Sequence, residues 1–199
     1  MSEKKVNFEA HFDLLREVGN IGAGNAVTAL AKMLNKRIDM QVPVINVVEF
    51  KNLADFIGGP EALVIGVMVD VTGDMNGIMM FLVRRESAHT LLDILMGRSE
   101  RSAEFTEIEV SALCEIGNIL SSSYLGSLAT MMNKTIIPSI PHLAMDMANA
   151  ILSVPAIEFG KVSDSVLFIE SVFGTEDENV SGYFMLVPDL PSFELIFNI

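Results

Sequence analysis

The stretch DLLREVGNIGAGNAVTALAKMLNKRIDMQVP, residues 13–43, recurs as SALCEIGNILSSSYLGSLATMMNKTIIPSIP, residues 111–141. The two copies align without a gap and are identical at 12 of their 31 positions. A period of about half the chain indicates a duplicated α/β unit, because the repeats of solenoid proteins are much shorter. We therefore predict a pseudo-twofold molecule whose function is carried out twice, or once at the pseudo-twofold axis.

Both copies keep four positions at the same spacing, written [Asp/Ser]-x3-Glu-x2-Asn-x22-Pro. These motif residues are Asp13, Glu17, Asn20 and Pro43 in the first copy, and Ser111, Glu115, Asn118 and Pro141 in the second. A solvated helix face with ordinary polar residues would account for a single copy, since short polar motifs arise by chance. It does not explain why Glu and Asn persist in register while their neighbours diverge, so we take the two pairs as candidate functional residues.

Apolar residues recur at helical spacing over residues 9–35 and 107–133, which predicts two long helices with the motif opposite the apolar stripe. Thr106 and Glu109 predict a capping box at the second start. Strands are expected over 38–50, 62–72, 77–83, 162–173 and 182–187, turns at 73–77 and 176–178, and shorter helices over 85–97, 142–152 and 193–198. We predict one α+β domain over residues 1–199, with halves of about 8–97 and 104–199. Its antiparallel or mixed sheet carries the two long helices.

Composition excludes several classes of function. The 13 basic and 26 acidic residues give a net charge of −13, which repels phosphate backbones, so we expect no nucleic-acid partner and consider a basic protein surface better suited. No apolar run approaches the ~18 residues that span a bilayer, so no membrane insertion is expected. The first residues contain no signal-peptide core, and the lone Cys114 cannot form an internal disulfide. These features predict a cytoplasmic protein.

The Glu/Asn pairs make an unusual active site, because no His, Cys or activated Ser accompanies them as a nucleophile with its own base. A carboxylate can bind a cation and a carboxamide can orient a water molecule, so such a pair could complete the active site of a partner. The three histidines and Cys114 lack metal-ligand spacing, and we expect no metal or cofactor of the chain's own. The helix glycines are expected to allow close approach, either of the sibling helix at Gly19 and Gly117 or of a partner at Gly24 and Gly126.

With these residues in hand, the chain resembles the CheC/CheX/FliY family of chemotaxis phosphatases over nearly its whole length, and its doubled motif resembles the CheC branch most. The resemblance implies hydrolysis of the phosphoaspartate of the response regulator CheY. It implies that Glu17 and Glu115 pair with the active-site lysine of CheY and that Asn20 and Asn118 orient the attacking water. Asp13, Pro43, Ser111 and Pro141 are then supporting positions, and CheY brings its own magnesium ion.

The same resemblance implies a second partner, CheD, the receptor glutamine deamidase. Residues 141–150 resemble the CheD-docking helix of the family, centred on Asp146. A helix after Pro141 would break the repeat, since a strand is expected after Pro43. An amphipathic helix that only covers the sheet remains an alternative. The alternative function is a non-catalytic interaction protein that binds CheD or resembles the flagellar-switch middle domains, which share the fold without both Glu/Asn pairs.

Overall fold

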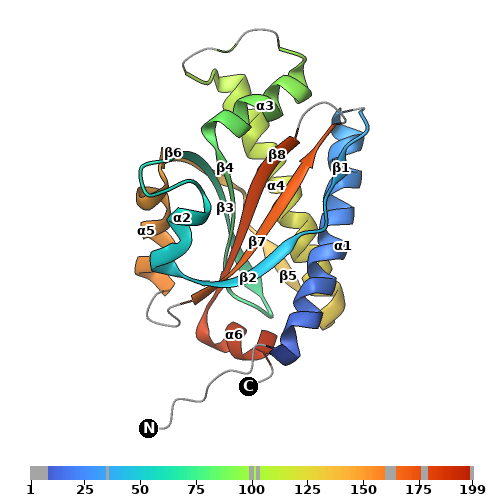
Figure 1. Cartoon of the computed structure of the whole chain (residues 1–199). Coiled ribbons are helices and arrows are strands. Elements are labelled where there is room, and N and C mark those ends of the chain that lie inside the picture. The colour runs from blue at the N-terminus through green and yellow to red at the C-terminus, as the bar shows by residue number, and fades with distance from the viewer. Residues whose placement is uncertain are drawn as a thin grey trace.

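The computed structural model describes residues 9–34, 36–98, 101, 104–159, 165–175 and 179–197. The first half contains α1 (Glu9–Leu34), β1 (Asp39–Met40), β2 (Val44–Glu49), the 3-10 helix η1 (Phe50–Asn52), α2 (Leu53–Phe56), β3 (Leu63–Gly73), β4 (Gly77–Arg84) and α3 (Arg85–Met96). The second contains α4 (Glu107–Met132), β5 (Ile136–Pro138), β6 (His142–Met147), α5 (Ala148–Phe159), β7 (Ser165–Gly174), β8 (Asn179–Pro188) and α6 (Leu190–Phe197). Both halves follow one order of elements, as Figure 1 shows. The predicted acidic turn at 176–178 lies outside the described residues.

One antiparallel sheet runs through both halves. Its central path is β1–β7–β8–β4–β3–β5, with β2 also pairing β7 and β6 also pairing β3. The first two strands of each half therefore pair with the hairpin of the other half: β1 and β2 pair with β7, and β5 and β6 pair with β3. This exchange ties the halves together through backbone hydrogen bonds, and the predicted α+β class with a duplicated unit is confirmed.

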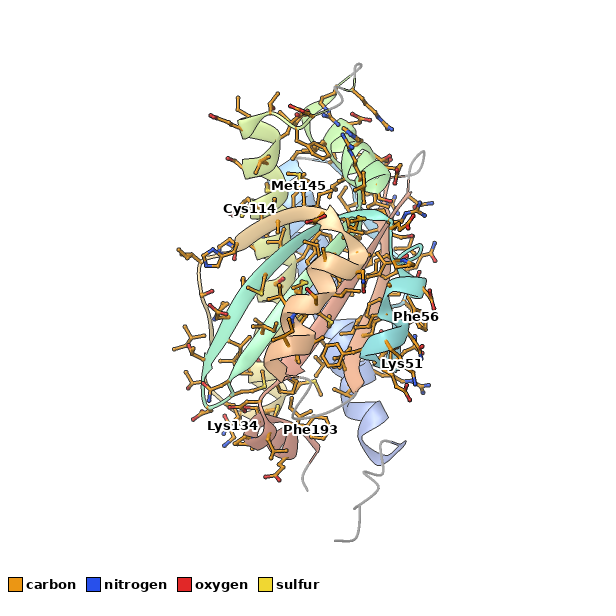
Figure 2. All side chains as sticks on the ribbon, turned by 90° about the vertical axis from the view of Figure 1, so that its left-hand side faces the viewer. Lys51, Phe56, Cys114, Lys134, Met145 and Phe193 are labelled. Carbon is orange, nitrogen blue, oxygen red and sulfur yellow. The ribbon has the colours of Figure 1, made fainter. Side chains whose placement is uncertain are left out.

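Helices cover both faces of the sheet. The long helices α1 and α4 lie on one face, and α2 and α5 lie on the other (Figures 1 and 2). An apolar core fills each side, the larger one under α1 and α4. α3 and α6 lie at the two ends of the larger core, between the long helices and the sheet (Figure 1). None of the helices within the described residues is long and apolar enough to cross a membrane.

Glycines set how closely the long helices approach their neighbours. A Cβ at Gly19 would lie 2.7 Å from Cδ1 of Ile45 on β2, and a Cβ at Gly117 would lie 2.6 Å from Cβ of Val67 on β3. The prediction that these two glycines admit the sibling helix is thus wrong, because both admit the sheet. The helices instead meet at Gly22, where a Cβ would lie 2.7 Å from the ring of Tyr124.

The start of α4 is fixed by the predicted capping box, which is confirmed. The Thr106 N–H donates to Oε2 of Glu109 at 2.7 Å, and the Glu109 N–H donates to Oγ1 of Thr106 at 3.3 Å. Arg98 forms ion pairs with Glu109 and, at 2.9 Å, with Asp93 of α3. The hydrogen bond from the Thr106 backbone is the main cause that lowers the pKa of Glu109. Arg98 therefore links α3 to the start of α4.

The predicted helix over 142–152 is wrong in its first half. Residues His142–Met147 form β6, which pairs antiparallel with Met68–Leu63 of β3, and α5 begins only at Ala148. β6 is an edge strand whose side chains are nearly all exposed. Leu143, Met145 and Met147 alternate along it, but a run of six residues is too short for this alternation to be told from a helical pattern. Its backbone partners lie far away in the sequence. The repeat is therefore kept after Pro141, just as β2 follows Pro43.

Candidate functional site

The first motif pair lies on the outer face of α1. Glu17 and Asn20 are exposed, whereas Leu15 and Val18 are buried against the sheet. Residues three apart on a helix are neighbours on its surface, so the carboxylate and the carboxamide lie side by side. Residue 13 belongs to α1, but the side chain of Asp13 lies outside the described residues.

The second pair has the same placement on α4. Ser111 and Glu115 are exposed and Asn118 is half-buried, while Leu113 and Gly117 face the core. Within the described part of the chain, no hydrogen bond or ion pair engages the side chain of a motif Glu or Asn in either half. Glu17, Asn20 and Glu115 are therefore exposed, Asn118 is partly exposed, and no partner within the described residues competes for their functional groups.

The motif proline of the first half is brought back to the motif Asn by the fold. From Asn20 the helix continues 14 residues to Leu34, a rise of about 21 Å at ~1.5 Å per residue. The extended segment that follows returns at about 3.3 Å per residue and reaches Pro43 beside α1. Asn20, Gly24 and Pro43 line one open groove of about 360 Å³. The 22-residue spacing of the motif is thus the length of this outward and return path.

In the second half, Pro141 also lies against its motif helix. The Cys114 thiol faces the carbonyl oxygen of Pro141 with an Sγ–O distance of 4.0 Å, and Cys114 lies one turn before Asn118. Figure 2 shows Cys114 on α4 next to β6. Burial, and then the neighbouring carboxylate of Glu115, raise the pKa of this thiol, which keeps it protonated and poorly nucleophilic.

The two pairs form two separate sites. α1 and α4 run in opposite directions (Figure 1) and contact each other where Gly22 meets Tyr124 and where Nδ2 of Asn25 donates to Oγ of Ser127 at 3.3 Å. Each Glu/Asn pair precedes this contact in its own helix. Because the helices are antiparallel, the pairs lie on opposite sides of the contact, so the motif is laid out twice and not once at the axis.

The chemistry available at each site is limited to a carboxylate and a carboxamide. Among the described residues, no three His, Cys, Asp or Glu side chains gather where they could hold a metal ion. A carboxylate accepts hydrogen bonds from an ammonium group, and a carboxamide both donates and accepts. Each site can therefore bind a cationic side chain and orient a water molecule.

Comparisons with known proteins show the family of the chain. A sequence model described as the CheC-like family matches residues 11–47 and 108–143, the two motif segments. The "CheY-P phosphatase CheC" of Bacillus subtilis is 34% identical over 194 residues, which are 95% of this chain and 93% of that protein. The chain belongs to the CheC-like family.

Solved structures of two further proteins share this fold. Thermotoga maritima FliY superposes with a TM-score of 0.73 at 24% identity, covering 95% of this chain and 96% of that one. Borrelia burgdorferi CheX, solved as a CheX–CheY–BeF3–Mg²⁺ complex, superposes with a TM-score of 0.54 at 15% identity, covering 83% of this chain and 94% of that one. At these identities the likeness concerns the fold alone.

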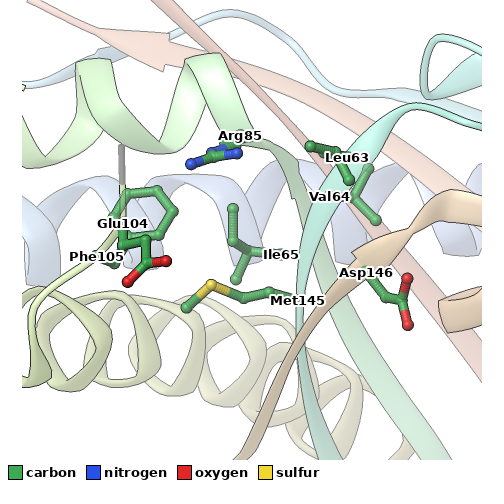
Figure 3. A pocket seen from close by; sticks show the side chains of 8 residues that line it. All are labelled: Leu63, Val64, Ile65, Arg85, Glu104, Phe105, Met145 and Asp146. Carbon is green, nitrogen blue, oxygen red and sulfur yellow. The ribbon is translucent and has the colours of Figure 1, made fainter. Parts of the chain in front are cut away.

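Asp146, the predicted CheD contact of this CheC-like chain, lies on the exposed edge strand β6 and not on a helix. Its Oδ1 accepts the N–H of Met147 at 2.7 Å. In Figure 3, Met145 points towards Phe105 across a pocket of about 380 Å³, while the carboxylate of Asp146 points away from Met145. This alternation is that of a strand.

Two neighbours of the motif prolines escaped the sequence analysis. Val42 and Ile140 each directly precede a motif proline, and both are strongly exposed. Their equivalent positions in the repeat were a signal that could have found them. A single apolar residue beside a proline does not indicate a functional site in the sequence, because its exposure is known only from the structure.

Proposed function

We propose that the chain is an aspartyl-phosphate phosphatase that hydrolyses the phosphoaspartate of a CheY-type response regulator. The observation that carries the proposal is the two Glu/Asn pairs on the outer faces of α1 and α4, whose side chains have no hydrogen-bond or ion-pair partner among the described residues. Two relatives support the choice of substrate. The Bacillus subtilis relative is named a CheY-P phosphatase, and Borrelia CheX was solved together with CheY.

In this proposal Glu17 and Glu115 dock the receiver domain, each through an ion pair with the lysine ammonium of the receiver's active site. Such a charge-assisted contact fixes orientation as well as adding affinity. The exposed carboxylates meet this requirement because they have no competing ion pair within the described structure. The overall charge of −13 also favours the approach of a basic surface.

Asn20 and Asn118 then orient the attacking water. The carboxamide oxygen accepts a hydrogen bond from the water and aims its lone pair at phosphorus, in line with the bond to the aspartate oxygen. A bond forms between the water oxygen and phosphorus while the bond between phosphorus and aspartate breaks. The products are inorganic phosphate and the regenerated aspartate carboxylate. In this proposal the magnesium ion belongs to the receiver domain, and the chain contributes no cofactor of its own.

We also propose CheD as a partner, with Asp146 as a contact residue. Two observations support this contact. Asp146 is exposed on an edge strand, and its neighbours Met145 and Met147 are also exposed. An edge strand also presents unpaired backbone groups to an incoming chain. Asp146→Lys should abolish CheD binding in a calorimetric titration and leave phosphatase activity intact, because β6 carries neither Glu/Asn pair. An unchanged affinity of the Asp146→Lys variant for CheD would show that CheD binds at another part of the surface.

The alternative function, a non-catalytic interaction protein, predicts binding without turnover. The decisive assay follows phosphate release from phosphorylated CheY with and without the purified chain. We expect accelerated release with CheY and negligible release from a small phosphate ester such as p-nitrophenyl phosphate, with or without magnesium. Binding of CheY without accelerated release would favour the alternative. Efficient turnover of the ester would indicate a self-sufficient phosphatase.

A further inference from the structure

The most exposed large apolar side chains among the described residues are Val42, at 79%, and Ile140, at 77%. They occupy equivalent positions of the internal repeat, each directly before a motif proline. A single exposed apolar residue is normal on a protein surface. Two at equivalent positions, each adjoining a functional motif, indicate a shared role.

The backbone holds both side chains in place. The Gln41 N–H donates to the carbonyl of Val172 on β7 at 2.9 Å, and the Ser139 N–H donates to the carbonyl of Asp70 on β3 at 2.8 Å. Gln41 and Ser139 are equivalent in the repeat, and each precedes its exposed apolar residue. In the second half, Oγ of Ser139 also accepts from the Asp70 N–H and donates to the Ile140 carbonyl, both at 2.9 Å. The backbone next to each apolar residue is therefore fixed to the sheet by hydrogen bonds, and the apolar side chain projects from this fixed backbone.

Each residue lies at the edge of one Glu/Asn site. Val42 lines the same groove as Asn20. Ile140 adjoins Pro141, whose carbonyl faces Cys114 one turn from Asn118. A molecule bound in the groove at Asn20 can therefore contact Val42, and Ile140 holds the equivalent position in the second half.

We propose that Val42 and Ile140 are docking residues that each contact an apolar area beside the phosphoaspartate of the receiver domain. The inference rests on the proposed function, since it assigns these residues to the same substrate protein. The occupant is a receiver surface that combines a lysine with neighbouring apolar side chains. Glu supplies the charged contact, and Val42 or Ile140 supplies the apolar one. A contact made equally in the ground state and the transition state lowers KM and leaves kcat unchanged.

The test isolates each half by silencing the other. In an Asn118→Ala background, where the first site carries the turnover, Val42→Asn should raise KM for phosphorylated CheY about tenfold at unchanged kcat. In an Asn20→Ala background, Ile140→Asn should do the same for the second site. Because both side chains are exposed, neither substitution opens a cavity, and circular dichroism should show intact folding.

A matched control is Ile157→Asn on α5, since Ile157 is 75% exposed and lies on the opposite face of the sheet. It should leave both kinetic constants unchanged in either background. An unaltered KM for the Val42 and Ile140 variants, or a loss of kcat at constant KM, would overturn the docking role. Failure of the proposed function would be seen separately, as an absence of phosphate release by the unaltered chain.

Discussion

At the scale of single residues, the division of labour within each site follows from chemistry. A carboxylate attracts a cation over several ångströms, whereas a carboxamide acts only at hydrogen-bond distance. The exposed positions of Glu17 and Glu115 suit the first task, and their neighbours three residues later suit the second. Docking and water orientation can therefore be altered independently.

Removing the two carboxylate charges tests the docking role. The variant Glu17→Gln/Glu115→Gln should raise KM for phosphorylated CheY by about tenfold, because a charge-assisted contact is lost at each site. The remaining activity should also depend less on ionic strength, since salt screens the interaction that was removed. Steady-state kinetics at low and high salt measure both effects.

Glu61→Gln is the matched control, because it removes the same charge from an exposed position before β3, away from both motif helices. It should leave KM near that of the unaltered chain. An equal rise in KM for Glu61→Gln would mean that net charge, and not the motif carboxylates, governs docking.

At the scale of elements, two glycines of α4 lie in different environments: Gly117 packs against the sheet and Gly126 lies on the open surface. Gly117→Ala should destabilise the fold by about 1–3 kcal/mol, because its Cβ would lie 2.6 Å from Cβ of Val67 and force α4 away from β3. Gly126→Ala should instead stabilise it by roughly 0.5–1 kcal/mol, since Gly126 has no atom within 4 Å of an added Cβ and alanine favours the helix. Chemical denaturation gives both values, and destabilisation by both variants would contradict the packing described here.

The junction between α3 and α4 predicts a pH dependence of stability. His89 stacks on Phe105 with ring centroids 4.4 Å apart, and its Nδ1 lies 3.4 Å from Nη2 of Arg98. Its pKa is lowered first by burial and then by Arg98, Arg101 and Arg85, against the opposing effect of Asp93. The folded state thus disfavours the imidazolium.

It follows that the free energy of unfolding should fall as the pH drops below about 6.5, the unfolded value, and through the lower folded pKa of His89. The contribution of one proton is at most ~1.4 kcal/mol per pH unit. His89→Gln should reduce this slope in denaturation curves between pH 7.5 and 5. A slope that is identical in the variant would show that other groups carry the dependence.

Several elements could be predicted from sequence because their determinants are local. The capping box needs only Thr106 and Glu109, and the exposure of Glu17 follows from the helical period of α1. β6 could not be predicted in this way, because the backbone partners of His142–Met147 lie on β3 and a run of six residues is too short to tell a strand's alternation from a helical pattern. The contacts of Gly19 and Gly117 with the sheet are likewise long-range. A sequence repeat does not reveal which neighbouring element packs against a small residue.

At the scale of the whole molecule, the exchange of strands explains how two sites can be held on one rigid frame. β2 of the first half pairs with β7 of the second, and β6 of the second pairs with β3 of the first. Each motif proline directly precedes or adjoins one of these exchanged strands. The geometry of either site therefore depends on both halves, although each half supplies its own Glu and Asn.

The central claim is that Asn20 and Asn118 perform the catalysis at two separate sites. Its most direct test compares the rate of phosphate release from phosphorylated CheY for the unaltered chain, the single variants Asn20→Ala and Asn118→Ala, and the double variant. We predict partial activity in each single variant and a loss of about a hundredfold or more in the double variant, with circular dichroism unchanged, because the oriented water is lost at both sites. Full activity in a folded double variant would contradict the account.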